Sequence, residues 1–403
     1  MRRRRLIIGA ATAALVAGTG TAVAVTAGSA SAATGYSVAP YVDLTASSAT
    51  MLNSAVTSGG LGAFTAAFII GAGCNPIWGD TLSPTNSTVN PFIDNARSKG
   101  AKMIVSFGGA GGVELAQSCT NTSSLTAAYQ SVISHYGIDH VDFDIEGAAI
   151  ADQGSIDRRF AAIRALEAAN SGLNVSVTIP VLENGPDFNG SAFLASAKRD
   201  GVSLNIVNAM TMDYGHAVAN MATAAETAAA GTLTAARNAG FTNMSFANIG
   251  ITPMIGNNDS GGEVVSEANA RTIVGWANSN GIGRLAFWSI GRDQPCAGGG
   301  VSPNCSGLGG ASLDFTRIFT GGSSNTGGPT PTTGPTTPRP TTPGPTPTQT
   351  TTNPGTASPW VVGHAYKVGD LVSYGGRNYK CLQAHTSQSD WTPPVVPALW
   401  QPV

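Results

Sequence analysis

Asp139-His140-Val141-Asp142-Phe143-Asp144-Ile145-Glu146-Gly147 carries three acids at every second position of an otherwise apolar run. Side chains alternate between the two faces of a β-strand, so the pattern predicts a strand that points Asp142, Asp144 and Glu146 the same way. The apolar residues between them are then expected to face a packed layer. Burying unpaired carboxylates is unfavourable, and residues 148–157 contain no basic side chain that would offset it. We therefore interpret the acidic face as a candidate catalytic site.

Apolar segments rich in β-branched residues recur on both sides of this stretch and alternate with alanine-rich, helix-prone segments. We expect strands at residues 38–44, 63–70, 101–107, 140–146, 175–180, 206–212, 244–251 and 284–289. Helices are expected between them, for example at residues 126–135, 153–169, 221–239 and 263–279. Eight such repeats predict an α/β fold, the (β/α)8 barrel, with its active site at the carboxyl ends of the strands. An open, doubly wound sheet is the alternative. In the barrel, Glu146 ends the fourth strand at the mouth and Asp142 lies deeper.

Residues 1–32 have the features of an export signal: arginines at positions 2 to 5, an apolar run, and Ala30-Ser31-Ala32 as a cleavage site. We expect the mature chain to begin near Ala33 and to be secreted and extracellular, without membrane attachment once the signal is removed. An uncleaved anchor is the alternative, but Gly, Thr and Ala interrupt the apolar run too often for a good spanning helix. Removing these four arginines changes the formal net charge from −2 to −6. Such a chain is a poor partner for nucleic acid and suits a neutral substrate.

A change of composition divides the remaining chain. Residues 321–358 are almost wholly Gly, Ser, Thr, Pro and Asn, which predicts an extended linker. The linker separates a catalytic-sized domain at residues 33–320 from a module at residues 359–403, for which we expect a small all-β fold. The core of so short a module is marginal, and its aromatic content indicates a role for its surface. We expect the protein to be a monomer.

The chain has five cysteines, which can oxidise after export. Cys296 and Cys305 lie close together in a glycine-rich loop, and Cys74 and Cys119 follow two consecutive predicted strands. We predict one disulfide within each pair and expect Cys381 to remain a buried thiol. No cysteine or histidine spacing fits a zinc site, so no metal is expected.

Several motifs resemble those of glycoside hydrolase family 18, the chitinase family, across most of residues 36–319. The DxxDxDxE signature of that family is matched by Asp139, Asp142, Asp144 and Glu146. Residues 106–109, Ser-Phe-Gly-Gly, match its SxGG element, and we interpret the glycines as room for a sugar beside the backbone. Trp288 ends the eighth strand, where the family places a tryptophan floor. Only about 30 residues separate the seventh and eighth strands, whereas several processive members carry an extra α+β domain there. We therefore expect a barrel without that insertion and with an open groove.

The resemblance implies how the acids divide the work of a glycosidase, which needs a proton donor and stabilisation of an oxocarbenium-like centre. Glu146 at the mouth is the expected acid/base. No second carboxylate is clearly placed as a nucleophile, and in family 18 the acetamido group of the substrate attacks the anomeric carbon instead. Asp144 is then implied to orient and charge-stabilise that group, and Asp142 to share a proton with Asp144. Asp139 has the opposite parity and is expected to be structural. No cofactor is expected.

The turn after the sixth strand departs from the commoner family pattern, in which a tyrosine precedes the aspartate. Met212 stands before Asp213, and Tyr214 follows it. We expect Asp213 and Tyr214 to belong to the catalytic machinery, and which residue replaces the usual tyrosine at Met212 stays open. Glu183 is a weaker candidate, and Trp78 is either a sugar platform or loop packing. The residues expected to bind substrate are Trp288, Ser106, Gly108, Gly109, Tyr41 and Met210.

The terminal module resembles the chitin-binding modules of carbohydrate-binding families 5 and 12 over its full length. Aromatic faces stack on the apolar faces of pyranose rings, which suits an insoluble polymer. Trp391 lies among polar residues in a loop and is the expected exposed platform, whereas Trp360 and Trp400 are expected to pack the small core. The border of the platform is expected to be formed by His385, Thr386 and Pro393.

These expectations describe a secreted chitinase that cleaves internal β-1,4 linkages with retention, and whose partners are chitin and N-acetylglucosamine oligomers. An endo-β-N-acetylglucosaminidase acting on N-glycans shares the barrel and the acids, but the chitin-binding module argues against it. A catalytically silent chitin lectin is a further alternative. Such members usually lack the terminal acid, whereas Glu146 is present.

Overall fold

The computed structural model describes residues 36–79, 81–296, 299–321, 357–362, 364–382, 385–387, 392–393 and 399–402. The expected export signal, most of the expected linker and Trp391 lie outside these residues. No helix within the described ranges is long and apolar enough to cross a membrane.

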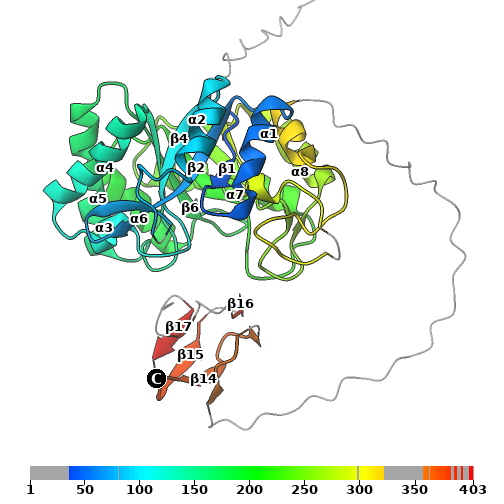
Figure 1. The fold of residues 1–403 in the computed structure, drawn as a ribbon. Coiled ribbons are helices and arrows are strands. Elements are labelled where there is room, and N and C mark those ends of the chain that lie inside the picture. The colour runs from blue at the N-terminus through cyan, green and yellow to red at the C-terminus, as the bar shows by residue number, and fades with distance from the viewer. Residues whose placement is uncertain are drawn as a thin grey trace, which may run out of the picture. The chain divides into compact units, whose positions relative to one another are not determined.

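Parallel strands form the centre of the larger folded part, and each pairs with the next in chain order (Figure 1). These strands are β1 (Tyr41–Asp43), β2 (Ala63–Ala72), β4 (Lys102–Gly108), β5 (His140–Asp144), β6 (Asn174–Pro180), β7 (Ile206–Met210), β8 (Ile249–Thr252) and β11 (Arg284–Leu285). The first and last strands also meet, because the Ala39 amide donates to the Leu285 carbonyl at 2.9 Å and the Tyr41 amide to the Phe287 carbonyl at 3.1 Å. The sheet is therefore closed, and the predicted (β/α)8 barrel is confirmed.

Helices cover the outside of the strands (Figure 1). They are α1 (Met51–Thr57), α2 (Asn90–Ser98), α3 (Leu115–Ser118), α4 (Thr122–Tyr136), α5 (Gln153–Ala169), α6 (Phe188–Arg199), α7 (Met221–Asn238), α8 (Glu267–Asn280) and α9 (Asp314–Thr320). The helix predicted at residues 153–169 is confirmed as α5. The Asp152 carboxylate accepts hydrogen bonds from the Gly154 and Ser155 amides, and this cap determines where α5 begins. The apolar faces of these helices pack on the outward side chains of the strands. Phe107 and Phe143, for example, stack at 5.3 Å, and Tyr129 of α4 meets Phe143 edge-on.

Several predicted strands are shorter than expected: β1 covers only residues 41–43, β5 ends at Asp144 and so does not include Glu146, and β7 ends at Met210. The strands expected at residues 244–251 and 284–289 differ more. Ser245 caps a 3-10 turn, η2 (Phe246–Asn248), so β8 begins only at Ile249. Within residues 284–289 the regular ladder ends at Leu285, and the chain then continues through a single bridge between Met254 and Trp288. The larger folded part also contains short antiparallel strands. β3 (Asn75–Trp78) pairs with β2, and β9 (Gly256–Asn257) pairs with β10 (Val264–Val265).

The terminal module is all-β. It contains β12 (Ser358–Pro359), β13 (Ala365–Tyr366), β14 (Leu371–Tyr374), β15 (Arg377–Cys381), β16 (His385–Thr386) and β17 (Trp400–Pro402). Its small core includes Tyr366, Tyr379 and the fully buried Trp400, and the partly buried Trp360 packs against it. The expectation that Trp360 and Trp400 pack the core is confirmed.

Disulfide bonds join the predicted cysteine pairs. Cys74 follows β2 and is bonded to Cys119 after α3, and Cys296 is bonded to Cys305 within the loop between β11 and α9. Cys381 is fully buried in the core of the module.

Candidate active site

Asp142 lies inside the barrel and is surrounded by hydroxyl groups. Its carboxylate accepts hydrogen bonds from Tyr41 Oη at 3.0 Å, Ser106 Oγ at 2.8 Å, Ser176 Oγ at 2.6 Å and Thr178 Oγ1 at 3.0 Å. The residue is completely buried. Because each donor comes from a different position on strands β1, β4 and β6, the carboxylate is held rigidly below the mouth.

Tyr41 and Ser106 were expected to bind substrate. The structure instead directs both hydroxyls to Asp142, and the two side chains are 3% and 0% exposed. Burial, and then the charge of Asp142, raises the pKa of Tyr41 well above its ordinary value, so its hydroxyl remains a donor. These residues therefore hold the acid that lies beneath the site.

A basic residue does approach Asp142, from a distant part of the chain. Arg284 begins β11 and donates from Nη1 to Ser176 Oγ at 2.8 Å. Burial lowers the pKa of Arg284, and the charge of Asp142 opposes this shift. The sequence around the acidic strand does not predict this partner, because Arg284 lies far from Asp142 along the chain. The sequence does contain an indication of Ser176 and Thr178. Polar and apolar side chains alternate along residues 174–180, as they do in a strand whose polar side chains face the inside of a barrel.

Asp144, one step nearer the mouth, has a different environment. It is 4% exposed, and its Oδ1 atom has no hydrogen-bond partner among the described residues. Burial, followed by the charges of Glu146 and Asp142, raises the pKa of Asp144 well above its ordinary value. A buried carboxyl with an unused oxygen is suited to binding a polar group of a ligand.

Glu146 follows the end of β5 and is partly exposed. Burial raises the pKa of Glu146 to about 7, and the charge of Asp213 contributes to this shift. A carboxyl group with that pKa is protonated in a large fraction of molecules at neutral pH, which a general acid requires.

The glycines at the end of β4 are explained by close contact with the protein itself. A side chain at Gly108, whose φ is +109°, would place its Cβ 2.0 Å from the Asp144 carbonyl oxygen. The Gly109 amide donates to the same oxygen at 3.0 Å, and a Cβ on Gly109 would lie 2.6 Å from the Phe68 ring. The SxGG element thus lets β4 approach the backbone of Asp144 and fixes it, which differs from the expected role as room for a sugar.

Trp288 belongs to an aromatic cluster across the mouth from the acids. Its ring stacks on Phe68 at 5.6 Å and lies 6.4 Å from the ring of Tyr41. Trp288 and Phe68 are both partly exposed. A partly exposed pair of rings at the strand ends is suited to stacking against a pyranose. The sequence did not single out Phe68.

The turn after β7 brings two of the expected catalytic side chains to this end of the barrel. Asp213 has a φ of +50°, and burial, followed by the charge of Asp259, raises its pKa to about 6. Tyr214 is 4% exposed, and its hydroxyl lacks a hydrogen-bond partner in the part of the chain that the structure describes. Met210 is partly exposed and Met212 is buried.

The other candidates have structural surroundings. Trp78 is fully buried and donates from Nε1 to Tyr136 Oη at 2.8 Å, so it is loop packing and not a sugar platform. Asp139 accepts from Tyr36 Oη at 2.9 Å at the amino end of β5, away from the mouth. Glu183 lies 3.2 Å from His216 in a partly exposed pair. Within the described ranges no group of three His, Cys, Asp or Glu side chains could hold a metal ion.

The expected platform of the module is described only in part. Trp391 lies outside the described residues, and His385 and Thr386 form β16, which pairs with β13. Pro393 is buried.

Comparison with known proteins agrees with both folded parts. Residues 359–401 match the model of carbohydrate-binding module family 5/12. The chain is 34% identical over 289 residues to a probable bifunctional chitinase/lysozyme of Escherichia coli K12, covering 67% of this chain and 32% of that protein. It is 33% identical over 275 residues to endochitinase 11 of Metarhizium anisopliae, covering 64% of this chain and 53% of that protein. The chain therefore spans only a third to a half of the length of these relatives.

Solved structures extend the comparison to the whole barrel. The catalytic domain of a hyperthermophilic chitinase from Pyrococcus furiosus superposes with a TM-score of 0.64 at 30% identity, covering 70% of this chain and 93% of that one. A family GH18 chitinase from Chromobacterium violaceum, at 16% identity and a TM-score of 0.50 over 72% of this chain and 83% of that one, shares the fold. The chain belongs to the glycoside hydrolase family 18 chitinases and carries a C-terminal carbohydrate-binding module of family 5/12.

Proposed function

We propose that this protein hydrolyses the β-1,4 linkages of chitin with retention of configuration, through the acetamido group of its substrate. The observation that carries the proposal is the contrast among the three acids at the end of β5 and just after it. Asp142 is held by hydroxyl groups, the Oδ1 atom of Asp144 has no partner among the described residues, and Glu146 at the mouth has a pKa raised to about 7.

Each acid then has one task. Glu146 gives its proton to the leaving glycosidic oxygen as the acetamido carbonyl oxygen bonds to the anomeric carbon. Asp144 faces that acetamido group, since its protonated carboxyl, with a pKa raised mainly by burial, can hydrogen-bond the amide while the cyclic intermediate forms. Glu146, now ionised, takes a proton from water, which attacks the same carbon and restores the acetamido group. Two inversions give net retention.

Asp213 and Tyr214 complete the proposed machinery from β7. The charge of Asp213 helps to keep Glu146 protonated. The buried hydroxyl of Tyr214, which lacks a partner in the described part of the chain, is available to the acetamido oxygen. Tyr214 thus takes the place of the tyrosine that commonly precedes the aspartate, where this chain has Met212.

We further propose that cleavage is internal. Between β8 and β11 the described residues form the β9–β10 hairpin and α8, and so short a connection supports a groove that is open at its sides. Long soluble chitin derivatives should then lose viscosity early in digestion. Release of dimers alone, without a fall in viscosity, would contradict internal cleavage.

We propose that the protein is exported and that its terminal module holds it on insoluble chitin. The aromatic sequence of the module and the match of residues 359–401 to family 5/12 support this role. Replacing Trp391 by Ala should abolish retention on crystalline chitin and leave turnover of soluble oligomers intact. Unchanged retention would exclude Trp391 as the platform.

The decisive experiment is time-resolved proton NMR of an N-acetylglucosamine hexamer with the wild-type protein and with Glu146→Gln. Wild-type protein should release the β-anomer first, and the variant should release none. Initial release of the α-anomer would exclude the substrate-assisted route. Binding without turnover by wild-type protein would favour the lectin.

A further inference from the structure

The Asp213-Tyr214-Gly215 turn has an uncommon backbone conformation that contacts from another segment stabilise. Asp213 has a φ of +50° and Gly215 a φ of +83°. A residue other than glycine rarely adopts a positive φ unless its surroundings fix it there. The source of this constraint decides how accurately Asp213 and Tyr214 face the groove.

One segment, residues 258–263 between β9 and β10, supplies the constraint. The Asp213 amide donates to Asn258 Oδ1 at 3.4 Å, and the Ser260 amide donates to Asp213 Oδ1 at 2.9 Å. The Gly215 amide donates to Glu263 Oε1 at 3.1 Å and to Ser260 Oγ at 3.3 Å. The turn is therefore held at both ends, by contacts to its backbone and to the Asp213 carboxylate.

Glu263 is the member of this segment that ordinary packing does not explain. It is 1% exposed, and its Oε2 atom has no partner among the described residues. The Gly215 amide donates to its Oε1 atom at 3.1 Å, and the neighbouring amides of Tyr214 and His216 also favour its ionised form. Burial nevertheless raises the pKa of Glu263 to about 7. A buried carboxyl in this position fixes the direction of the turn that carries Tyr214.

We propose that Glu263 is a positioning residue for the reaction: it holds the Asp213–Tyr214 turn so that both side chains meet the acetamido group. The inference rests on the proposed function of Asp213 and Tyr214. Glu263 does not touch substrate in this scheme and acts only through the backbone of the turn.

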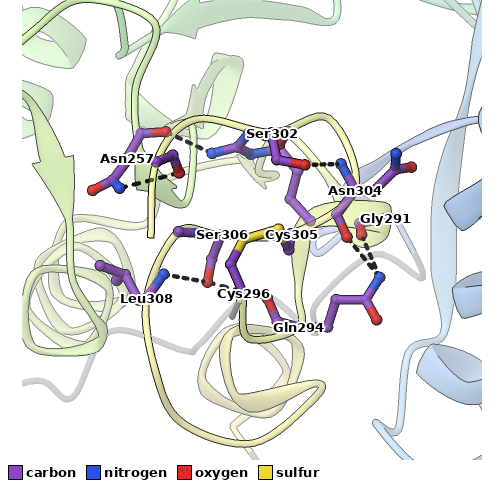
Figure 2. Close-up of a disulfide and its surroundings, with 12 residues drawn as sticks. Asn257, Gly291, Gln294, Cys296, Ser302, Asn304, Cys305, Ser306 and Leu308 are labelled. Carbon is purple, nitrogen blue, oxygen red and sulfur yellow. Dashed lines mark hydrogen bonds between the residues drawn. A yellow bond between two sulfur atoms is a disulfide. The ribbon is translucent and has the colours of Figure 1, made fainter. Parts of the chain in front are cut away.

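The β9–β10 hairpin next to Glu263 is stabilised by hydrogen bonds to Arg292 and to the loop at residues 300–306. Arg292 donates from Nη2 to the carbonyls of Ile255 at 3.0 Å and Asn257 at 2.6 Å. The Asn257 amide donates to the Ser306 carbonyl at 2.8 Å, and Asn257 Nδ2 donates to the Gly300 carbonyl at 3.2 Å. Figure 2 shows Asn257 beside the loop that the Cys296–Cys305 bridge closes. These hydrogen bonds fix the hairpin next to Glu263.

The test compares Glu263→Ala and Glu263→Gln with the wild-type protein, below the pKa of Glu263 of about 7. Ala removes the acceptor, so kcat for a chito-oligosaccharide should fall about 100-fold with KM changed by less than about threefold. Gln keeps an oxygen for the Gly215 amide and should restore kcat to within about threefold of wild type. Glu267→Gln, in the first turn of α8 and paired with Arg271, is the matched control and should have no effect.

A double-mutant cycle separates positioning from general damage. In a background with Asp213→Asn and Tyr214→Phe, adding Glu263→Ala should lower kcat by no more than about threefold, because the carboxylate and the hydroxyl that it positions are already removed. A loss of kcat that is equal in both backgrounds would overturn the proposal. So would a Gln variant as inactive as the Ala variant.

A second readout needs no turnover. Hydrogen exchange at the amides of residues 213–216 should accelerate in Glu263→Ala and remain slow in Glu263→Gln. Unchanged exchange in the Ala variant would overturn the positioning role by itself. A wild-type protein that does not cleave chito-oligosaccharides would instead refute the proposed function, so the two failures are distinguishable.

Discussion

Asp142 and Asp144 of β5 and Glu146, just after its end, lie two residues apart and yet have three different environments. Asp142 is held by hydroxyl groups, Asp144 is buried with an unused oxygen, and Glu146 faces the mouth. Side chains on one face therefore differ in their surroundings according to their distance from the mouth. The alternating pattern predicted which side chains share the face. It did not predict all of their partners, because Tyr41 and Arg284 come from the first and last strands, which only the closed barrel brings close to β5.

The charge of Asp213 should set the upper pH limit of activity. It helps to raise the pKa of Glu146, so Asp213→Asn should lower that pKa and move the alkaline limb of kcat/KM down by roughly half a unit. Asn tolerates the positive φ of this position. A pH profile on a soluble oligomer measures the shift, with the exposed Asp157→Asn as control. A limb that stays in place would show that another group controls it.

Glu146 should also reduce stability above neutral pH. Its pKa rises from 4.5 in the unfolded chain to about 7 in the fold, so the folded state retains the proton more tightly. This contribution is complete below about pH 4.5 and is lost as the pH rises through about 7. At pH 8, Glu146→Gln should therefore raise the free energy of unfolding, on the order of 2 kcal/mol.

Chemical denaturation at pH 8 and pH 4 measures this effect. The gain should be present at the higher pH and largely absent at the lower. An equal gain at both values would assign it to packing and not to charge.

At the scale of elements, α3 depends on a buried ion pair. Glu114 caps this short helix by accepting from the Ala116 amide at 2.7 Å, and it pairs with Arg159 of α5 at 2.6 Å. Replacing Glu114 by Ala leaves Arg159 buried without its carboxylate and should lower the free energy of unfolding by about 3–5 kcal/mol. Denaturant unfolding measures the loss.

The same pair offers its own control. Adding Arg159→Met removes the uncompensated charge and should restore a substantial part of the stability. A double variant no more stable than Glu114→Ala alone would show that the helix cap, and not the ion pair, is responsible.

Sequence patterns predicted the presence of an element better than its exact ends. The helix expected at residues 153–169 begins where Asp152 caps it. The pattern of residues 244–251 predicts one strand, but Ser245 caps a 3-10 turn and β8 begins only at Ile249. Hydrophobic pattern alone does not register such a cap.

At the scale of the whole molecule, the alternation of strand and helix segments predicted the barrel correctly, because each repeat follows the same local rule. The conformation of the turn that carries Asp213 was not predictable from the sequence. Its support comes from residues 258–263 and the loop around Cys296–Cys305, and no local pattern connects these distant segments.

Ending the chain after residue 321 should separate the two tasks of the molecule. The barrel is closed by its own strands, so kcat on a soluble hexamer should stay within about twofold of the full chain. Retention on crystalline chitin should fall to that of an unrelated protein, because residues 359–401 carry the family 5/12 match. Pull-down and soluble-substrate assays of both forms measure this; equal retention would place the main chitin contact on the barrel.

The hydrogen bonds between residues 37–41 and 285–287 also impose an order on biosynthesis. The first strand has no partner on one side until the last strand has been translated, which takes on the order of ten seconds or more at typical elongation rates. Until then its free edge can pair with another nascent chain. A ribosome that stalls before residue 285 would release an open, aggregation-prone sheet. A circular permutant of residues 36–321 with new ends between α8 and β11 would let β11 pair with β1 early in translation, and it would move the late-closing edge to β8 and β11.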